Sequence, residues 1–305
     1  MFAVISDIHS NLEALNVVLA EIDRRAIQRI ICLGDIVGYG ASPKECLDLV
    51  AERSAVCICG NHDHAVFYEP YNFNVGAERA AYWTRMVFEE ETNKPLRNQR
   101  WDFLGHLPER HEYNGLVFAH GSPRRPVNEY LFAEDIYTNP AKIQANFERL
   151  DQHQMACFVG HTHVPGVFLD DPYFDPPADL PEVGRYEITP EEKAIINVGS
   201  VGQPRDRNPQ ASFVVVHESD DQQAGKPSGN NTPSGDSPGN NPGPAGLVAA
   251  STLPKTPEET APPDKFRPVT VEFVRLRYDI EKAMKKILAV TELDDFLGHR
   301  LLDGR

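Results

Sequence analysis

Five short stretches of the chain carry side chains that bind metal ions or move protons, and each follows an apolar run. They are Asp7-Ile8-His9, Gly34-Asp35, Gly60-Asn61-His62-Asp63, His120-Gly121 and Gly160-His161-Thr162-His163. The runs before them have the length and composition of strands, at residues 2–5, 30–33, 55–59, 116–119 and 156–159. Because sites in open α/β sheets form at the carboxyl ends of the strands, the repetition predicts that all five loops meet at one edge of one sheet.

The residue types in these loops suit a pair of metal ions. Alternate residues of an extended segment share a face, as Asp7 and His9 do and as His161 and His163 do. The two oxygens of Asp35 can bridge two ions. We therefore predict two ligand sets that share this carboxylate: Asp7, His9, Asp35 and His163 around one ion, and Asp35, Asn61, His120 and His161 around the other. Mixed oxygen and imidazole ligands favour Mn, Fe, Zn or Ni over Mg or Ca.

Charge predicts what such a centre binds. Two divalent ions bring four positive charges, and Asp7 and Asp35 return only two negative ones, so the site stays electropositive and attracts phosphate. Ions about 3.5–4 Å apart share a hydroxide that attacks phosphorus in line. His62 is not needed as a ligand and is placed to protonate the leaving oxygen. We expect His62 and Asp35 to act in catalysis, and Asn61 to contact substrate as well as metal.

Each motif alone has an ordinary structural explanation. Gly-Asp commonly marks a turn, Asp-x-His occurs by chance, and Asp63 either orients His62 or caps the turn that follows. Their occurrence in order, at five strand ends, is what favours a site.

The elements that must position these loops begin with alternating strands and helices. Ser10-Asn11-Leu12-Glu13 predicts a capping box, in which Ser10 accepts from the Glu13 backbone and the Glu13 side chain reaches back. Ser42 and Pro43 predict the start of a second helix. The first 60 residues are therefore a βαβαβ unit, which implies a parallel sheet covered by helices.

The rest of the chain departs from this alternation. Residues 64–115 form a helical excursion, with helices expected at 77–91 and 96–107. Short strands at 166–169, 194–197, 212–217 and 271–276 predict antiparallel pairing, and Asp279 is expected to cap a closing helix. Residues 219–267 are rich in Gly, Pro, Ser, Asn and Thr, which predicts a low-complexity, disordered insertion in a hairpin loop, serving either as a tolerated expansion or as a partner-binding segment.

Composition limits the partners. The 305 residues carry a formal net charge of -15, which disfavours nucleic-acid polymers and anionic membranes. Four of the five cysteines lie in strand-like runs, which indicates buried free thiols in a reducing compartment. With no secretory signal or membrane span visible, we expect a cytoplasmic protein that binds a small phosphate ester, either alone or as a homo-oligomer.

These motifs, with the run Asn197-Val198-Gly199-Ser200-Val201-Gly202-Gln203-Pro204-Arg205, resemble the calcineurin-like metallophosphoesterase superfamily, and most of all its small bacterial and archaeal phosphodiesterase branch. The resemblance spans residues 1 to about 217 and resumes at Val271. It implies a single-domain, four-layer α/β/β/α sandwich with a dinuclear metal centre between the sheets. It also implies hydrolysis of a phosphomonoester or phosphodiester by a metal-bridging hydroxide. Every ligand position of the family pattern is filled, which argues against its non-catalytic scaffold members.

We therefore expect a metal-dependent phosphoesterase for diesters or small nucleotides, with His62 as general acid. The alternatives are a non-enzymatic, metal-stabilised protein-interaction module and a protein phosphatase. The loop at residues 199–205 offers backbone amides and Arg205 to a phosphate, or is a plain Gly/Pro loop with a solvated Arg. Arg124 and Arg125 are further candidates for this contact.

Overall fold

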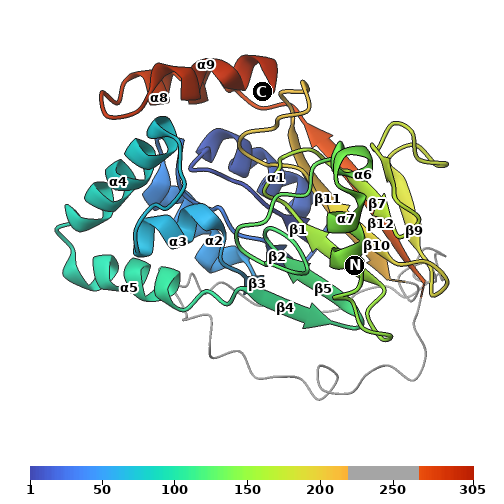
Figure 1. Ribbon diagram of the computed structural model, residues 1–305. Coiled ribbons are helices and arrows are strands. Elements are labelled where there is room, and N and C mark those ends of the chain that lie inside the picture. The colour runs from blue at the N-terminus through green and yellow to red at the C-terminus, as the bar shows by residue number, and fades with distance from the viewer. Residues whose placement is uncertain (219–267) are drawn as a thin grey trace, which may run out of the picture.

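Two six-stranded sheets lie face to face, with helices on their outer sides (Figure 1). The computed structural model describes residues 1–218 and 268–305, and the expectation for residues 219–267 lies outside them. The strand order is β3-β2-β1-β11-β12-β9 in the first sheet and β4-β5-β6-β10-β7-β8 in the second. These layers are the four-layer arrangement that the resemblance implied.

The first sheet has a parallel and an antiparallel half. Its strands are β1 (Phe2–Ile5), β2 (Ile30–Cys32), β3 (Val56–Cys57), β9 (Arg185–Ile188), β11 (Ala211–Glu218) and β12 (Val269–Leu276). As the βαβαβ pattern predicts, β1, β2 and β3 are parallel. Strand β11 returns antiparallel beside β1, and β12 and β9 continue the antiparallel half.

The second sheet receives two of the five ligand-bearing strands. Its members are β4 (Arg110–Tyr113), β5 (Leu116–Ala119), β6 (Ala156–Val159), β7 (Gly166–Leu169), β8 (Tyr173–Asp175) and β10 (Ala194–Asn197). Strands β5, β6 and β10 are parallel, while β7 pairs antiparallel with β10 as expected. The expectation of a single sheet edge is therefore wrong. Runs such as β5 and β6 are apolar on both faces, so their sequence does not reveal which neighbours they join.

Helices cover both outer faces. They are α1 (Leu12–Arg24), α2 (Pro43–Arg53), α3 (Asn61–Phe67), α4 (Val75–Glu89), α5 (Lys94–Gly105), α6 (Asp135–Thr138), α7 (Pro140–Phe147), α8 (Ile280–Leu288) and α9 (Asp295–Asp303). The predicted helices of the excursion are confirmed as α4 and α5, but its last part is strand β4. The predictions missed α3, α6, α7 and α9, which have four to nine residues each; α8 has nine residues as well and was predicted from its N-cap, Asp279.

Alternation along the strands separates three apolar layers. Phe2 and Val4 point into the space between the sheets, whereas Ala3 and Ile5 face α1 and α2. In the second sheet, Phe118 and Phe158 fill the same central layer, while their strand neighbours pack against α6 and α7. All five cysteines are buried and free, as predicted. Within residues 1–218 and 268–305, no helix has both the length and the apolar character needed to cross a bilayer.

The start of α1 differs from the predicted capping box. Asn11, not Ser10, is the N-cap, and its side-chain oxygen accepts from the Ala14 amide at 3.1 Å. Glu13 does not reach back; its carboxylate pairs with Lys286 of α8 at 2.7 Å and lies 3.4 Å from Lys282. A tertiary ion pair has replaced the local hydrogen bond because α8 places two ammonium groups beside this buried carboxylate.

The Glu13–Lys286 pair predicts a stability difference between two neighbouring lysines. Glu13 is only 7% exposed, so Lys286→Met leaves its carboxylate with Lys282 alone and should lower the free energy of unfolding by about 1–2 kcal/mol. Lys285→Met is the matched control, because Lys285 pairs with an exposed Glu281 and its loss should cost under about 0.5 kcal/mol. Urea denaturation measures both; equal effects would contradict a structural role for this pair.

Candidate metal centre

The seven predicted ligands converge where strand ends of the two sheets meet. Asp7 and His9 follow β1, Asp35 follows β2 and Asn61 opens α3 after β3. From the second sheet, His120 follows β5, and His161 and His163 follow β6. All seven side chains are buried. His9 and His161, which are 152 positions apart in the chain, therefore belong to the same centre.

The side chains form two groups around Asp35. In the first, His163 Nε2 lies 3.1 Å from Asp7 Oδ1 and 3.2 Å from His9 Nε2. In the second, His120 Nε2 lies 3.4 Å from Asp35 Oδ2, 3.1 Å from His161 Nδ1 and 3.2 Å from Asn61 Oδ1. Asp35 Oδ2 is also 3.6 Å from His9 Nε2, so this one oxygen lies between the groups. The grouping matches the two predicted ligand sets, while the assignment of each ligand to an ion stays a prediction.

Backbone carbonyls fix the orientation of three imidazoles. The Nδ1 atoms of His9, His120 and His163 lie 3.2, 3.0 and 2.6 Å from the carbonyl oxygens of Val37, Leu33 and Gln203. A proton on each Nδ1 satisfies that contact and leaves the Nε2 lone pair directed at the centre, as in metal-binding histidines. His161 has the opposite orientation, since its Nδ1 faces the centre.

The carboxylates are held in a similar way. Asp35 Oδ1 accepts from the His62 amide at 2.8 Å, and Asp7 Oδ2 accepts from the His161 amide at 3.0 Å. One oxygen of each carboxylate is thereby fixed by a backbone amide, and the other oxygen faces the imidazoles. Asp7 Oδ1 is buried without a hydrogen-bond partner in the described residues. Such an orphaned anionic oxygen beside imidazole lone pairs fits a bound cation.

The backbone of the ligand loops is strained. Asp7, His9, Asp35, His161 and His163 all have φ between 49° and 65°, the left-handed region that non-glycine residues rarely occupy. Each such residue costs on the order of 1–3 kcal/mol, and strain of this kind concentrates at functional sites. Local propensity thus opposes the conformation, and the tertiary packing imposes it.

Two glycines allow the loops to approach closely. A Cβ on Gly160 would lie 2.4 Å from Asp7 Oδ2, and one on Gly60 would lie 2.2 Å from Asp35 Oδ1. Both distances are far inside van der Waals contact, so any side chain there would displace a carboxylate. The glycines that precede Asn61 and His161 are therefore part of the site.

Burial and charge set the protonation states. Burial raises the pKa of the Asp7 and Asp35 carboxyls, but the facing imidazoles of His163 and His120 outweigh it and bring both pKa values below their usual range. Burial lowers the pKa of the His120 imidazole, yet Asp35 outweighs it and raises the pKa to about 9, so a cation that binds at Nε2 would first have to displace a proton from that nitrogen. Burial holds the pKa values of His9 and His161 well below the ordinary value. At neutral pH the carboxylates are ionised, and these last two imidazoles are in the neutral form that binds metals.

His62 lies at the wall of the centre. Its ring contacts those of Tyr39, Phe73 and His9 at centroid distances of 4.3, 4.7 and 4.9 Å, and its Nδ1 is buried without a hydrogen-bond partner in the described residues. Asp63 does not orient this ring. Its carboxylate accepts from the amides of Gly60, Ile36 and Val37, which joins the start of α3 to the loop after β2.

The loop at residues 199–205 has most of its backbone amides bound within the protein, while the Arg205 side chain is only partly engaged. The amides of Gly199, Val201, Gly202, Gln203 and Arg205 donate to other protein groups, so the expectation that they approach a phosphate is wrong. The Arg205 guanidinium donates to Gln203 Oε1 and lies 5.7 Å from the centroid of the Tyr39 ring. Arg124 pairs with Glu129 and is already neutralised.

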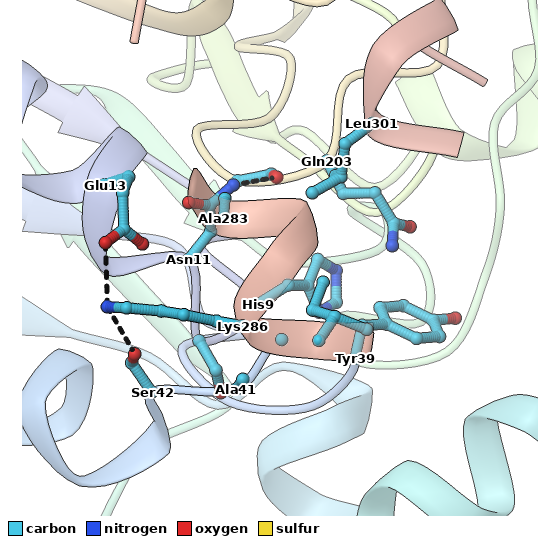
Figure 2. A pocket seen from close by; sticks show the side chains of 14 residues that line it. His9, Asn11, Glu13, Tyr39, Ala41, Ser42, Gln203, Ala283, Lys286 and Leu301 are labelled. Carbon is cyan, nitrogen blue, oxygen red and sulfur yellow. Dashed lines mark hydrogen bonds and ion pairs between the residues drawn. The ribbon is translucent and has the colours of Figure 1, made fainter. Parts of the chain in front are cut away.

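Cavities of very different size lie around the centre within the described residues. Figure 2 shows α8 against His9 and Tyr39, with Lys286 reaching Glu13 and Ser42, and the cavity there is only about 10 Å³. Tyr130 lines two cavities, of about 470 and 420 Å³, that are large enough for a small ligand. Sequence reasoning missed Tyr130, whose only signal was an aromatic residue in the long loop after His120.

This fold and this cluster together define the class of protein. The model of the calcineurin-like phosphoesterase superfamily domain matches residues 1–221, and the chain belongs to this superfamily, whose members are generally hydrolases. The chain is 34% identical to an uncharacterized protein of Methanocaldococcus jannaschii over 312 residues, which cover 100% of this chain and 98% of that protein.

Two solved structures match the chain along its length. The metallophosphoesterase from Sphaerobacter thermophilus is 28% identical, with a TM-score of 0.67, and the match covers 100% of this chain and 98% of that one. A hypothetical protein from Pyrococcus horikoshii OT3 has a TM-score of 0.61 and the same coverage at 16% identity, a likeness of fold alone. The similarity therefore includes α8 and α9, beyond the range of the family model.

The shared position of Asp35 predicts how metal content responds to substitution. After incubation with Mn²⁺ and desalting, the wild-type protein should hold two equivalents by elemental analysis. Asp7→Asn should lose about one, because Asp7 belongs to one group, whereas Asp35→Asn should weaken both. Asp170→Asn, an exposed aspartate after β7, is the control and should keep both ions. Unchanged metal in Asp35→Asn would contradict the shared role.

Proposed function

We propose that this protein is a metal-dependent phosphoesterase that hydrolyses a phosphodiester or another small phosphate ester. The observation that carries the proposal is the pair of side-chain groups that share Asp35 Oδ2. Asp7, His9, Asp35 and His163 would hold one divalent ion, and Asp35, Asn61, His120 and His161 the other. When bound, two such ions lower the pKa of a water molecule and neutralise charge on phosphoryl oxygens.

In this proposal His62 supplies the proton for the leaving oxygen. Burial lowers the pKa of the His62 imidazole to about 4, and Asp35 acts in the opposite direction. A phosphate ester brings further negative charge beside the ring, which raises the pKa as Asp35 does. Binding of the ester would favour the protonated imidazole, which would donate its proton as the bond to the leaving oxygen breaks.

Arg205 is proposed to bind the phosphate. Its Nε is buried without a hydrogen-bond partner in the described residues, while its other end is held by Gln203. An anionic ester would satisfy that donor, and a guanidinium is suited to phosphate oxygens. Asn61 would contact the substrate through the same amide group that faces His120. A net charge of -15 supports a small ester rather than a nucleic-acid polymer.

Hydrolysis of bis(p-nitrophenyl) phosphate tests the activity. With Mn²⁺ or Ni²⁺ present, the wild-type protein should release p-nitrophenol, and Asp35→Asn should lose at least about a hundredfold in kcat/KM because both ion groups are disturbed. Removal of metal by a chelator should abolish activity, and addition of Mn²⁺ should restore it. Equal rates for the wild type and Asp35→Asn would refute the proposal.

The role of His62 predicts a dependence on the leaving group. In His62→Ala, kcat for a phenyl ester should fall by about a hundredfold or more, and less for a p-nitrophenyl ester, whose leaving oxygen needs little protonation. Metal content should stay at the wild-type value. Exposed His106, substituted by alanine, is the control. Loss of metal would instead identify His62 as a ligand, which its closeness to His9 and Asp35 permits.

Other outcomes would favour the alternatives. Stoichiometric metal without turnover on a broad panel of phosphate esters would support a non-enzymatic interaction module. Turnover confined to phosphopeptides would support a protein phosphatase.

A further inference from the structure

A cavity of about 470 Å³ lies near the candidate metal centre. Thr162, which stands between His161 and His163, forms part of its wall, and Arg205 forms another part. The remaining wall is mainly apolar and includes Tyr130, Phe132 and Phe174. Ligand sites in proteins combine an apolar wall with a few polar groups in this way.

The rings of this wall form an ordered stack. The Tyr130 ring lies parallel to that of His161, with centroids 3.6 Å apart and planes inclined by 21°. The Phe132 ring continues the arrangement at 5.4 Å from Tyr130, with an inclination of 2°. The stack therefore extends from a candidate metal ligand to the cavity wall. Tyr130 and Phe132 are nonetheless 39% and 46% exposed, so much of their apolar surface stays in contact with water.

The polar groups of the same cavity are of two kinds. Arg205 offers a cationic donor whose Nε is buried without a partner in the described residues, which suits a phosphate. Glu134 offers a carboxylate, which accepts hydrogen bonds from the amino groups that nucleobases carry. The cavity of about 420 Å³ that Tyr130 also lines is more polar, with His64, Glu69 and two asparagines besides Asn61 in its wall.

We propose that the larger cavity binds a nucleobase, stacked against the Tyr130–Phe132 pair, so that the substrate is a nucleotide ester. The position of its phosphate at the metal centre rests on the proposed function; the stacking itself does not. Aromatic side chains can stack on the π face of a base, and they do so whichever base it is. A sugar phosphate without a base lacks the π face that such a stack binds.

The test compares two ligands that differ by the base alone. Adenosine 5′-monophosphate and ribose 5-phosphate are titrated into the Mn²⁺-loaded protein by calorimetry, and phosphate release is followed in parallel. The wild-type protein should bind the adenosine ester at least about tenfold more tightly. If either ester is hydrolysed, the same ratio is taken from kcat/KM. Turnover tests the proposed function, whereas the ratio tests the base subsite.

Variants of Phe132 test whether the difference in affinity depends on the aromatic stack. Phe132→Leu keeps an apolar side chain but removes the ring, and should reduce the ratio about fivefold or more, whereas Phe132→Trp should retain it. Tyr137→Leu is the matched control, because Tyr137 is 80% exposed on α6 and lines neither cavity, and it should leave the ratio unchanged. Equal affinities of the wild type for the two ligands, or an undiminished ratio in Phe132→Leu, would overturn the proposal. The comparison of the two ligands uses the wild-type protein alone, so it tests the proposal even if a variant fails to fold.

Discussion

The hydrogen bond from the His161 amide to Asp7 Oδ2 joins the two sheets at the candidate site. Around it, the amides of Val201 and Gly202 donate to the carbonyls of Ser6 and Asp7. Asp7 belongs to a loop of the first sheet, and His161 and His163 to a loop of the second. Each ligand group combines residues from both sheets, so neither group can be complete unless this contact holds the two loops together.

The site is costly to build, and the core around it supplies the rigidity. Five ligand residues adopt the left-handed conformation, and two carboxylates and four imidazoles are withdrawn from water. The apolar layer between the sheets, in which Phe118 and Phe158 stack 5.3 Å apart, packs β5 and β6 against the first sheet. Close packing of this layer leaves the loops little freedom to relax into an unstrained shape.

The C-terminal helices complete one wall of the site and contribute to its charge. Tyr39, which lies next to His9, packs in a cluster with Ala283 of α8 and Leu301 of α9 (Figure 2). Burial and the nearby Arg205 lower the pKa of Arg300 in α9 to about 10, which remains well above neutral pH. Two guanidinium groups therefore lie near this aromatic wall, and they offset the negative charge of the Asp7 and Asp35 carboxylates.

The sequence by itself determined which side chains form the candidate centre, because metal ligands require particular residue types and each stood at the end of a recognisable strand. It also determined the parallel start and the helices α4 and α5, the second from a weaker pattern of apolar residues. Only the tertiary structure decided that the ligand strands divide between two sheets, that Glu13 pairs with Lys286, and that Tyr130 stacks on His161. These outcomes depend on contacts between residues that are distant in the chain. The sequence around β5, Glu13 and Tyr130 does not indicate which distant residues they contact.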